Sequence, residues 1–149
     1  MTYSFERLTA ADAPDFTALL RVFGDAFGDA ETYGGAVPSP AYLSGFLGRP
    51  QNVVLVGKSG GEVVGGLVAY VLEKFERERS EIYIYDLAVA EAHRRRGIAR
   101  NLIELLRSVS RELGAYVIYV QADYGDDAAI ALYTSLGTRE DVMHFDITP

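Results

Sequence analysis

Apolar and polar residues alternate along some segments of the chain and recur at helical spacing along others. Alternation over residues 3–8 and a continuous apolar run at 53–56 predict strands, the second of them buried on both faces. Phe16, Leu19 and Phe23 recur three and four positions apart, which predicts a helix with one apolar stripe. The same patterns predict further strands at 62–72, 81–89 and 116–121 and further helices at 41–47, 97–113 and 126–136.

Glycines mark several of the connections between these elements. Gly60 and Gly61 predict a tight hairpin turn between the second and third predicted strands. Gly65 and Gly66 indicate a bulge in the returning strand of this hairpin. Residues 24–40 are rich in glycine, proline and acidic residues, so we expect a long irregular loop there.

The order of the elements predicts one mixed α/β sheet in a single domain covering residues 1–149. The strands at 81–89 and 116–121 are joined by a helix, so they should run parallel with a right-handed crossover. Residues 139–147 are a further candidate strand that would close the sheet.

Composition narrows the chemistry. The chain has no cysteine, which excludes disulfides and a cysteine nucleophile and is compatible with the cytoplasmic location that we expect. A net charge of −7 argues against nucleic-acid binding and suits a cationic small molecule, although acidic charge can also serve solubility alone. The apolar run at 63–72 is too short to span a bilayer and residues 1–13 do not resemble a signal peptide, so we expect no membrane association.

A basic turn joins the strand at 81–89 to the helix at 97–113, and it reads Arg-Arg-Arg-Gly-Ile-Ala from Arg94 to Ala99. The first amides of a helix lack partners and lie at the positive end of its dipole, so they can bind phosphate. Small residues at Gly97 and Ala99 let an anion approach the backbone closely. A solvated arginine cluster is the alternative, but the place of the turn between strand and helix favours a pyrophosphate site.

The spacing Arg-x-x-Gly-x-Ala resembles the Gln/Arg-x-x-Gly-x-Gly/Ala signature of the GNAT family of N-acetyltransferases. Leu87-Ala88-Val89 and Leu132-Tyr133-x-x-Leu136-Gly137 extend the resemblance over nearly the whole chain. It implies the GNAT fold, a mixed, mostly antiparallel twisted sheet with one central parallel strand pair, flanked by helices. It also implies acetyl-CoA as co-substrate, held by residues of the strand end, the turn and the last helix: Leu87, Ala88, Val89, Arg94, Arg95, Arg96, Gly97, Ile98, Ala99, Arg100, Asp126, Ala129 and Tyr133.

Residues 81–89 and 116–147 are similar, more narrowly, to gentamicin-modifying aminoglycoside 3-N-acetyltransferases, with residues 114–127 and 143–146 the most specific part. This resemblance implies acetylation of the 3-amino group of a 2-deoxystreptamine aminoglycoside such as gentamicin. Ala99, Asp126 and Thr138 depart from the commoner family residues, and Asp126 stands where many members have Asn. Its usual cofactor contact is therefore in doubt. A homodimer through the C-terminal strand is an expectation by family analogy alone.

Acetyl transfer to an amine needs a base for the ammonium proton and an acid for the leaving thiolate. Tyr133 is the candidate acid by its match to the family tyrosine, although a tyrosine that only packs on its helix would look the same in sequence. Asp86 and Asp123 are the candidate bases because they lie at the ends of the two parallel strands. Other nearby carboxylates, or a water relay, remain open as the base. Glu81 and Asp86 face opposite sides of a regular strand, and a bulge would change that.

A polycationic substrate should be held by carboxylates through charge-assisted hydrogen bonds. The candidate substrate-binding residues are Asp29, Glu31, Glu81, Tyr83, Asp123, Asp126 and Asp127. Asp126 or Asp127 could instead only cap the last helix. Their spacing fits no metal motif and the chain has two histidines far apart, so no metal is expected. Acetylation of a polyamine or a protein N-terminus, and binding of acetyl-CoA without turnover, are rival functions.

Overall fold

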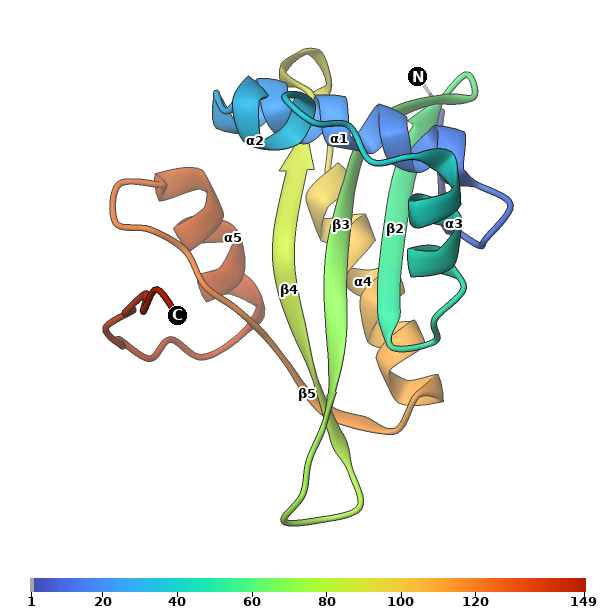
Figure 1. Ribbon diagram of the computed structural model, residues 1–149. Coiled ribbons are helices and arrows are strands. Elements are labelled where there is room, and N and C mark those ends of the chain that lie inside the picture. Colours follow the sequence, from blue (N-terminus) through green and yellow to red (C-terminus); the bar gives the residue numbers. More distant parts are fainter. Residues whose placement is uncertain (1) are drawn as a thin grey trace.

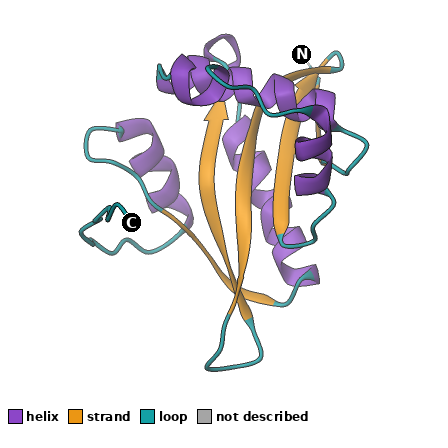
Figure 2. Cartoon of the chain, in the orientation of Figure 1, coloured by secondary structure: helices purple, strands orange, loops and turns teal. Residues whose placement is uncertain are grey.

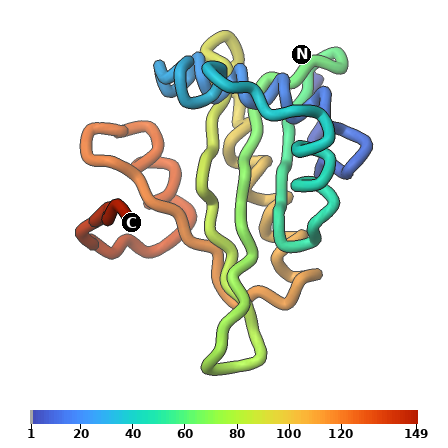
Figure 3. Tube along the Cα trace, viewed as in Figure 1, coloured from blue at the N-terminus to red at the C-terminus, as the bar shows by residue number. Residues whose placement is uncertain are grey.

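The computed structural model describes residues 2–149, and a sheet lies at its centre (Figure 1). Helices flank the strands, as the colouring by secondary structure in Figure 2 shows. Figure 3 follows the path of the chain from the N-terminus to the C-terminus. The elements in chain order are β1 (Tyr3–Arg7), α1 (Ala13–Phe27), α2 (Ala30–Gly34), α3 (Pro40–Leu47), β2 (Asn52–Ser59), β3 (Glu62–Glu73), β4 (Ser80–Val89), a 3₁₀ turn η1 (Glu91–His93), α4 (Ile98–Glu112), β5 (Ala115–Val120) and α5 (Asp127–Leu136).

The sheet has five strands in the order β1-β2-β3-β4-β5. Neighbours pair antiparallel from β1 to β4, and β4 pairs parallel with β5. Two apolar clusters cover its faces, one formed with α1 and α3 and the other with α4. The expected mixed sheet with one parallel pair, flanked by helices, is therefore confirmed. Within the described residues, no helix is both long and apolar enough to cross a membrane.

Two irregularities shape the sheet. In β3 the pairing passes from Gly57↔Gly65 to Lys58↔Val63, so Val64 is an extra residue beside the predicted glycines. Gly66 is a site of close approach, because a Cβ atom there would lie 2.6 Å from the carbonyl oxygen of Leu55. The second irregularity is in β4, where Tyr85 is the extra residue between the partners of Val68 and Ala69.

Two expectations from the sequence were wrong. Residues 139–147 form no strand in the structure, although their alternation suits one. A strand needs a neighbour to pair with, and no described strand lies beside this segment or along the second edge of β5. Residues 24–40 are not one irregular loop, because α1 continues to Phe27 and α2 follows. The Asp29 side chain caps α2 by accepting from the Thr32 amide at 3.1 Å, a local signal that glycine content obscured.

Candidate active site

The two parallel strands separate at their carboxyl ends and leave part of β4 open. Pairing between them runs from Ser80↔Ala115 to Ile84↔Val120 and then stops. The last residues of β4, Leu87, Ala88 and Val89, still pair with β3 on the other side. Their backbone groups that point toward β5 therefore lack a partner among the described strands, and a ligand with amide groups could pair with them.

The basic turn has the backbone of an anion site. Gly97 is the N-cap of α4 in the left-handed conformation, with φ of 77°, and it offers no side chain to cap the helix. The first helical hydrogen bond runs from the Asn101 amide to the Gly97 carbonyl oxygen at 3.0 Å. The amides of Ile98, Ala99 and Arg100 therefore precede the helical hydrogen-bond ladder and can receive a phosphate oxygen.

The arginines of the turn divide into two groups. Arg94 donates from Nε to the Val89 carbonyl oxygen at 3.1 Å, and Arg100 donates to Ser135 Oγ at 2.8 Å. These contacts tie the turn to the end of β4 and to α5. Arg95, which has a left-handed backbone with φ of 63°, and Arg96 are exposed. They are the side chains best placed to attract an anion from solvent.

Asp86 is half-buried on the side of the sheet covered by α1, α2 and α3. Tyr33 of α2 donates from its hydroxyl to Asp86 Oδ2 at 2.9 Å. Burial raises the pKa of the Asp86 carboxyl above its ordinary value, and the hydrogen bond from Tyr33 opposes that change. Burial, followed by this hydrogen bond, raises the pKa of Tyr33, so its hydroxyl stays protonated and a donor. A carboxylate with a raised pKa is a better proton acceptor, as a general base requires.

The bulge at Tyr85 places three candidate residues of β4 on one face. Asp86 lies opposite Val68, Tyr83 opposite Tyr70 and Glu81 opposite Leu72, and these partners alternate regularly along β3. In a regular strand Glu81 and Asp86 would have faced opposite sides, so the bulge is what brings them together. Glu81 already pairs with Lys74 at 3.0 Å, and the Tyr83 hydroxyl donates to Gln121 Oε1 at 3.0 Å.

Tyr133 lies on α5 and packs in the apolar cluster that also includes Leu87, Val89 and Val120. It therefore lies on the side of the sheet that α4 covers. Burial, with a smaller contribution from the charge of Asp126, raises the pKa of Tyr133 to about 12. Its hydroxyl remains protonated at neutral pH, which is the form that a general acid needs.

Asp123, Asp126 and Asp127, at the start of α5, are exposed, and the Asp126 carboxylate has a local structural role. Asp126 caps α5 by accepting from the Ala129 amide at 3.3 Å, which is the capping role that the sequence left open for it. Asp127 lies in the first turn of the helix, and Asp123 accepts the Asp126 amide on its carbonyl oxygen at 3.2 Å. Within the described residues, no hydrogen bond or ion pair joins these three carboxylates to Asp86 or to α2. Glu31 lies on α2, the helix that carries Tyr33, and Asp29 is the N-cap of that helix.

A pocket of about 240 Å³ opens beside Asp86, between the sheet and the first three helices. Four tyrosines and several apolar side chains line it, and Asp86 is its acidic residue: Phe16, Leu20, Phe23, Tyr33, Pro38, Tyr42, Leu43, Phe46, Val68, Tyr70, Tyr85 and Asp86. Sequence reasoning missed Tyr33, Tyr42 and Tyr70 as site residues. For Tyr33, the available signal was its place as a tyrosine within the acidic segment 24–40. Because this segment was interpreted as an irregular loop, Tyr33 was not considered as a site residue.

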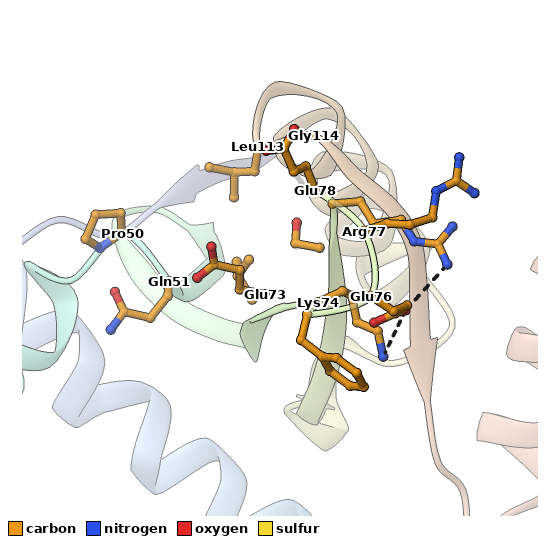
Figure 4. A pocket seen from close by; sticks show the side chains of 13 residues that line it. Pro50, Gln51, Glu73, Lys74, Glu76, Arg77, Glu78, Leu113 and Gly114 are labelled. Atoms are coloured by element: carbon orange, nitrogen blue, oxygen red, sulfur yellow. Dashed lines mark ion pairs between the residues drawn. The ribbon is translucent and has the colours of Figure 1, made fainter.

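A larger hollow of about 980 Å³ lies at the β3–β4 hairpin, the opposite end of β4 from Val89. Figure 4 shows its walls, where Glu76 pairs with Lys74 and with Arg79 at 3.6 Å each. None of the candidate site residues lines it. The open strand ends and Asp86 therefore define the candidate active site, and the larger hollow does not.

The two histidines contact residues outside the candidate active site. His93 Nδ1 lies 3.0 Å from the Tyr3 hydroxyl, and the exposed His144 lies 2.8 Å from Asp146 on the segment that forms no strand. The described residues contain no cluster of three potential metal ligands.

The parallel strand pair that separates at its carboxyl ends is joined by α4, a helix without a side-chain N-cap that follows an Arg-x-x-Gly-x-Ala turn. This arrangement is the GNAT fold. Residues 17–138 match the Acetyltransferase (GNAT) family, and the chain belongs to this family. It is 32% identical over 98 residues to the N-alpha-acetyltransferase RimI of Mycobacterium tuberculosis (strain ATCC 25618 / H37Rv), covering 66% of this chain and 59% of that protein. It is 28% identical over 90 residues to N-acetyltransferase family 8 member 2 of Rattus norvegicus, covering 60% of this chain and 40% of that protein. The chain thus spans less than two thirds of the length of either relative.

Solved structures give longer matches. An aminoglycoside acetyltransferase, HMB0005, from an uncultured soil metagenomic sample superposes with a TM-score of 0.97 at 52% identity, covering 100% of this chain and 99% of that one. A second one, meta-AAC0020 from the same kind of source, in complex with sisomicin, superposes with a TM-score of 0.90 at 35% identity. That match covers 99% of this chain and 96% of the other.

Proposed function

We propose that this protein transfers the acetyl group of acetyl-CoA to an amino group of an aminoglycoside, and that the group is the 3-amine of the 2-deoxystreptamine ring. The observation that carries the substrate class is the match at 52% identity to a soil aminoglycoside acetyltransferase along the whole chain. The choice of the 3-amine rests on the resemblance of residues 81–89 and 116–147 to gentamicin-modifying enzymes.

In this proposal the pyrophosphate of acetyl-CoA binds the amides of Gly97 to Arg100, with Arg95 and Arg96 adding positive charge. What supports this is the glycine N-cap of α4, which leaves the first-turn amides without a side-chain acceptor. The backbone of Leu87 to Val89 pairs with β3 but has no described strand partner on the β5 side, and its groups there can bond the amide-bearing arm of the co-substrate; the Val89 carbonyl oxygen already accepts from Arg94. The same strand end has amides that can polarise the thioester carbonyl.

The chemistry is a direct transfer between two bound substrates. The amine nitrogen forms a bond to the acetyl carbon, the carbon–sulfur bond breaks, and the electron pair leaves with sulfur. Asp86 takes the ammonium proton before attack, Tyr133 gives its proton to the thiolate, and the second proton that the nitrogen loses as the amide forms restores the Tyr133 hydroxyl. Asp123 remains the alternative base, directly or through a water. The support for Asp86 is its raised pKa and its place beside the pocket.

In this proposal, acidic residues at α2, on β4 and at the start of α5 hold the polycationic substrate, although none of them lines the 240 Å³ pocket itself. Asp29 contributes from the N-cap of α2 and Glu31 from the helix itself, and Glu81 and Tyr83 contribute from β4. Asp123 and Asp126 contribute from the loop before α5 and Asp127 from the first turn of that helix. Hydrogen bonds from Thr32 hold the pKa of the Asp29 carboxyl below its ordinary value, so it is charged at neutral pH. A charged carboxylate can make the strong hydrogen bonds that ammonium groups seek.

The test is release of coenzyme A from acetyl-CoA in the presence of gentamicin, sisomicin, kanamycin or fortimicin. We expect turnover with at least one of them, and NMR of the product should place the acetyl group on the 3-amine. No release above the hydrolysis background with any of these drugs would reject the substrate class. An acetyl group at another amine would reject only the regiochemistry.

Acetylation of a protein N-terminus is the second candidate function, and the similarity to an N-alpha-acetyltransferase supports it. A peptide with a free N-terminus should then be acetylated, and cells that express the protein should gain no drug resistance. A module that only binds acetyl-CoA would release no coenzyme A with either kind of acceptor.

We further propose a homodimer in which a second copy covers the C-terminal segment. One support is the second edge of β5, along which no described strand pairs. The other is a set of four large apolar side chains that are 70–89% exposed: Val142, Met143, Phe145 and Ile147.

A further inference from the structure

Tyr33 joins the short helix α2 to β4. Its hydroxyl reaches Asp86 Oδ2 at 2.9 Å across 53 positions of sequence. Its ring is held from the other side by Phe23 and Phe27 of α1, with centroids at 5.8 and 5.6 Å. The phenol is therefore fixed at both ends, by aromatic packing at the ring and by the carboxylate at the hydroxyl.

This contact makes the two oxygens of Asp86 unequal. Oδ2 accepts the hydrogen bond from Tyr33, while Oδ1 has no hydrogen-bond partner among the described residues. Asp86 also lines the 240 Å³ pocket, so the unused acceptor belongs to a side chain that a ligand in that pocket can reach. A carboxylate held by one oxygen offers the other in a fixed direction.

We propose that Tyr33 is a positioning residue for Asp86, holding the carboxylate by Oδ2 so that Oδ1 receives the proton of the substrate ammonium group. The inference rests on the proposed function, because it takes Asp86 as the base. Helix α2 then has two roles, because it carries Tyr33 as well as acidic residues. The helix that would bind the polycation also orients the group that deprotonates it.

The surroundings of Asp86 make a pH experiment interpretable. The titratable groups around Asp86 are tyrosines. Tyr33 lies on α2, Tyr70 on the neighbouring strand β3, and Tyr83 and Tyr85 on β4, the strand of Asp86 itself. Burial is the main cause that raises the pKa of Tyr33, Tyr70 and Tyr83, so these phenols stay neutral through the neutral range. Asp29 is the other charged group that acts on Tyr33. The remaining pocket residues from α1 and α3 are apolar except for Tyr42.

The first experiment is an NMR titration of the Asp86 carboxyl carbon without any substrate. The hydrogen bond from Tyr33 lowers the pKa of Asp86, so Tyr33→Phe should raise it further while keeping the ring packing. Tyr42→Phe is the matched control, because it removes a phenol hydroxyl from the same pocket without touching the carboxylate. An Asp86 titration that is the same in wild type and Tyr33→Phe would overturn the inference.

The second experiment follows kcat against pH with acetyl-CoA and the preferred aminoglycoside. A base acts when deprotonated, so a raised pKa of Asp86 moves the acid limb of the profile to higher pH. We expect Tyr33→Phe to lose about tenfold in kcat on that limb and to recover toward wild type at higher pH, with an unchanged KM for acetyl-CoA. An equal loss at every pH, typical of a merely structural role, would contradict the inference.

The two proposals fail separately. Absence of turnover in the wild type rejects the proposed function, whereas the NMR titration still decides whether Tyr33 controls the carboxylate. Turnover by Asp86→Asn at the wild-type rate would reject the inference together with the assignment of Asp86 as the base, and would leave the proposed acetyl transfer standing.

Discussion

Residues 2–114, which form strands β1 to β4 and helices α1 to α4, and the C-terminal arm, defined here as residues 115–149 with β5 and α5, differ sharply in how they bury apolar side chains. In the first region Leu55, Leu67 and Leu102 are fully buried, and every buried hydrophobic residue of the described chain precedes Ser110. In the C-terminal arm α5 buries no residue, and Ile147 is 89% exposed. Yet the arm carries Tyr133, the candidate acid, so the buried core lies in one region while the proposed chemistry uses side chains of both.

The strongest effect that we expect is on unfolding. Leu102→Ala should lower the free energy of unfolding by about 3 kcal/mol, because it opens a cavity under α4 where the side chain is 0% exposed. Leu136→Ala removes a partly buried leucine from α5 and should cost about 1 kcal/mol or less. Urea denaturation of both variants tests the difference. Equal losses would mean that the C-terminal arm is as firmly packed as the sheet.

The second expected effect is on turnover and concerns the function of the arm. Tyr133→Phe should lower kcat about 100-fold with little change in KM, since proton transfer to the thiolate is lost while the ring packing stays. With the pKa of Tyr133 raised to about 12, the wild-type donor stays protonated, so activity should not fall through its ionisation as pH rises from neutral to mildly alkaline. Steady-state kinetics across that range measure both.

Tyr116→Phe is the matched control for this substitution. It removes a hydroxyl from β5, also in the C-terminal arm, at a residue whose ring packs under Arg79 and not at the strand opening. A similar loss of kcat in both variants would show that the arm responds to any change, and Tyr133 would lose its role as acid.

The third expected effect is on co-substrate affinity and lies at the junction of the two regions. Gly97→Ala places a Cβ atom on a left-handed residue, which should cost about 1 kcal/mol of stability and displace the first amides of α4. We expect acetyl-CoA to bind about tenfold more weakly by calorimetry. Gly114→Ala has nearly the same strain, with φ of 72°, at the other end of α4. It should match the loss of stability and leave acetyl-CoA binding as it is.

The sequence was most informative where one local rule determines the outcome. The glycine pair at 60 and 61 predicted the hairpin, and the turn at Gly97 predicted the strand-to-helix junction, because each depends on backbone geometry that few other residues allow. The parallel pair followed from a single helical connection between two strands.

What the sequence did not predict depends on contacts between distant segments. From the sequence we could say only that a bulge, if present, would change which face of the strand Glu81 and Asp86 occupy. The structure has this bulge at Tyr85, and because of it the two residues share a face. The hydrogen bond of Tyr33 to Asp86 spans 53 positions, and no local pattern indicates it. The strand expected at 139–147 failed for the same reason, since alternation states a preference for pairing but supplies no partner.

The smallest expected effect is on the stability of the single chain, and it tests why the C-terminal arm is exposed. Phe145→Ser and Ile147→Ser should change the free energy of unfolding of the monomer by no more than about 0.5 kcal/mol, because these side chains are 74% and 89% exposed. In the proposed dimer the same changes should weaken association, which light scattering after gel filtration would measure as a lower mass. Stability would then depend on protein concentration in the wild type and not in the variants. A large loss that is independent of concentration would place the arm against its own sheet, and the contrast between the two regions would disappear.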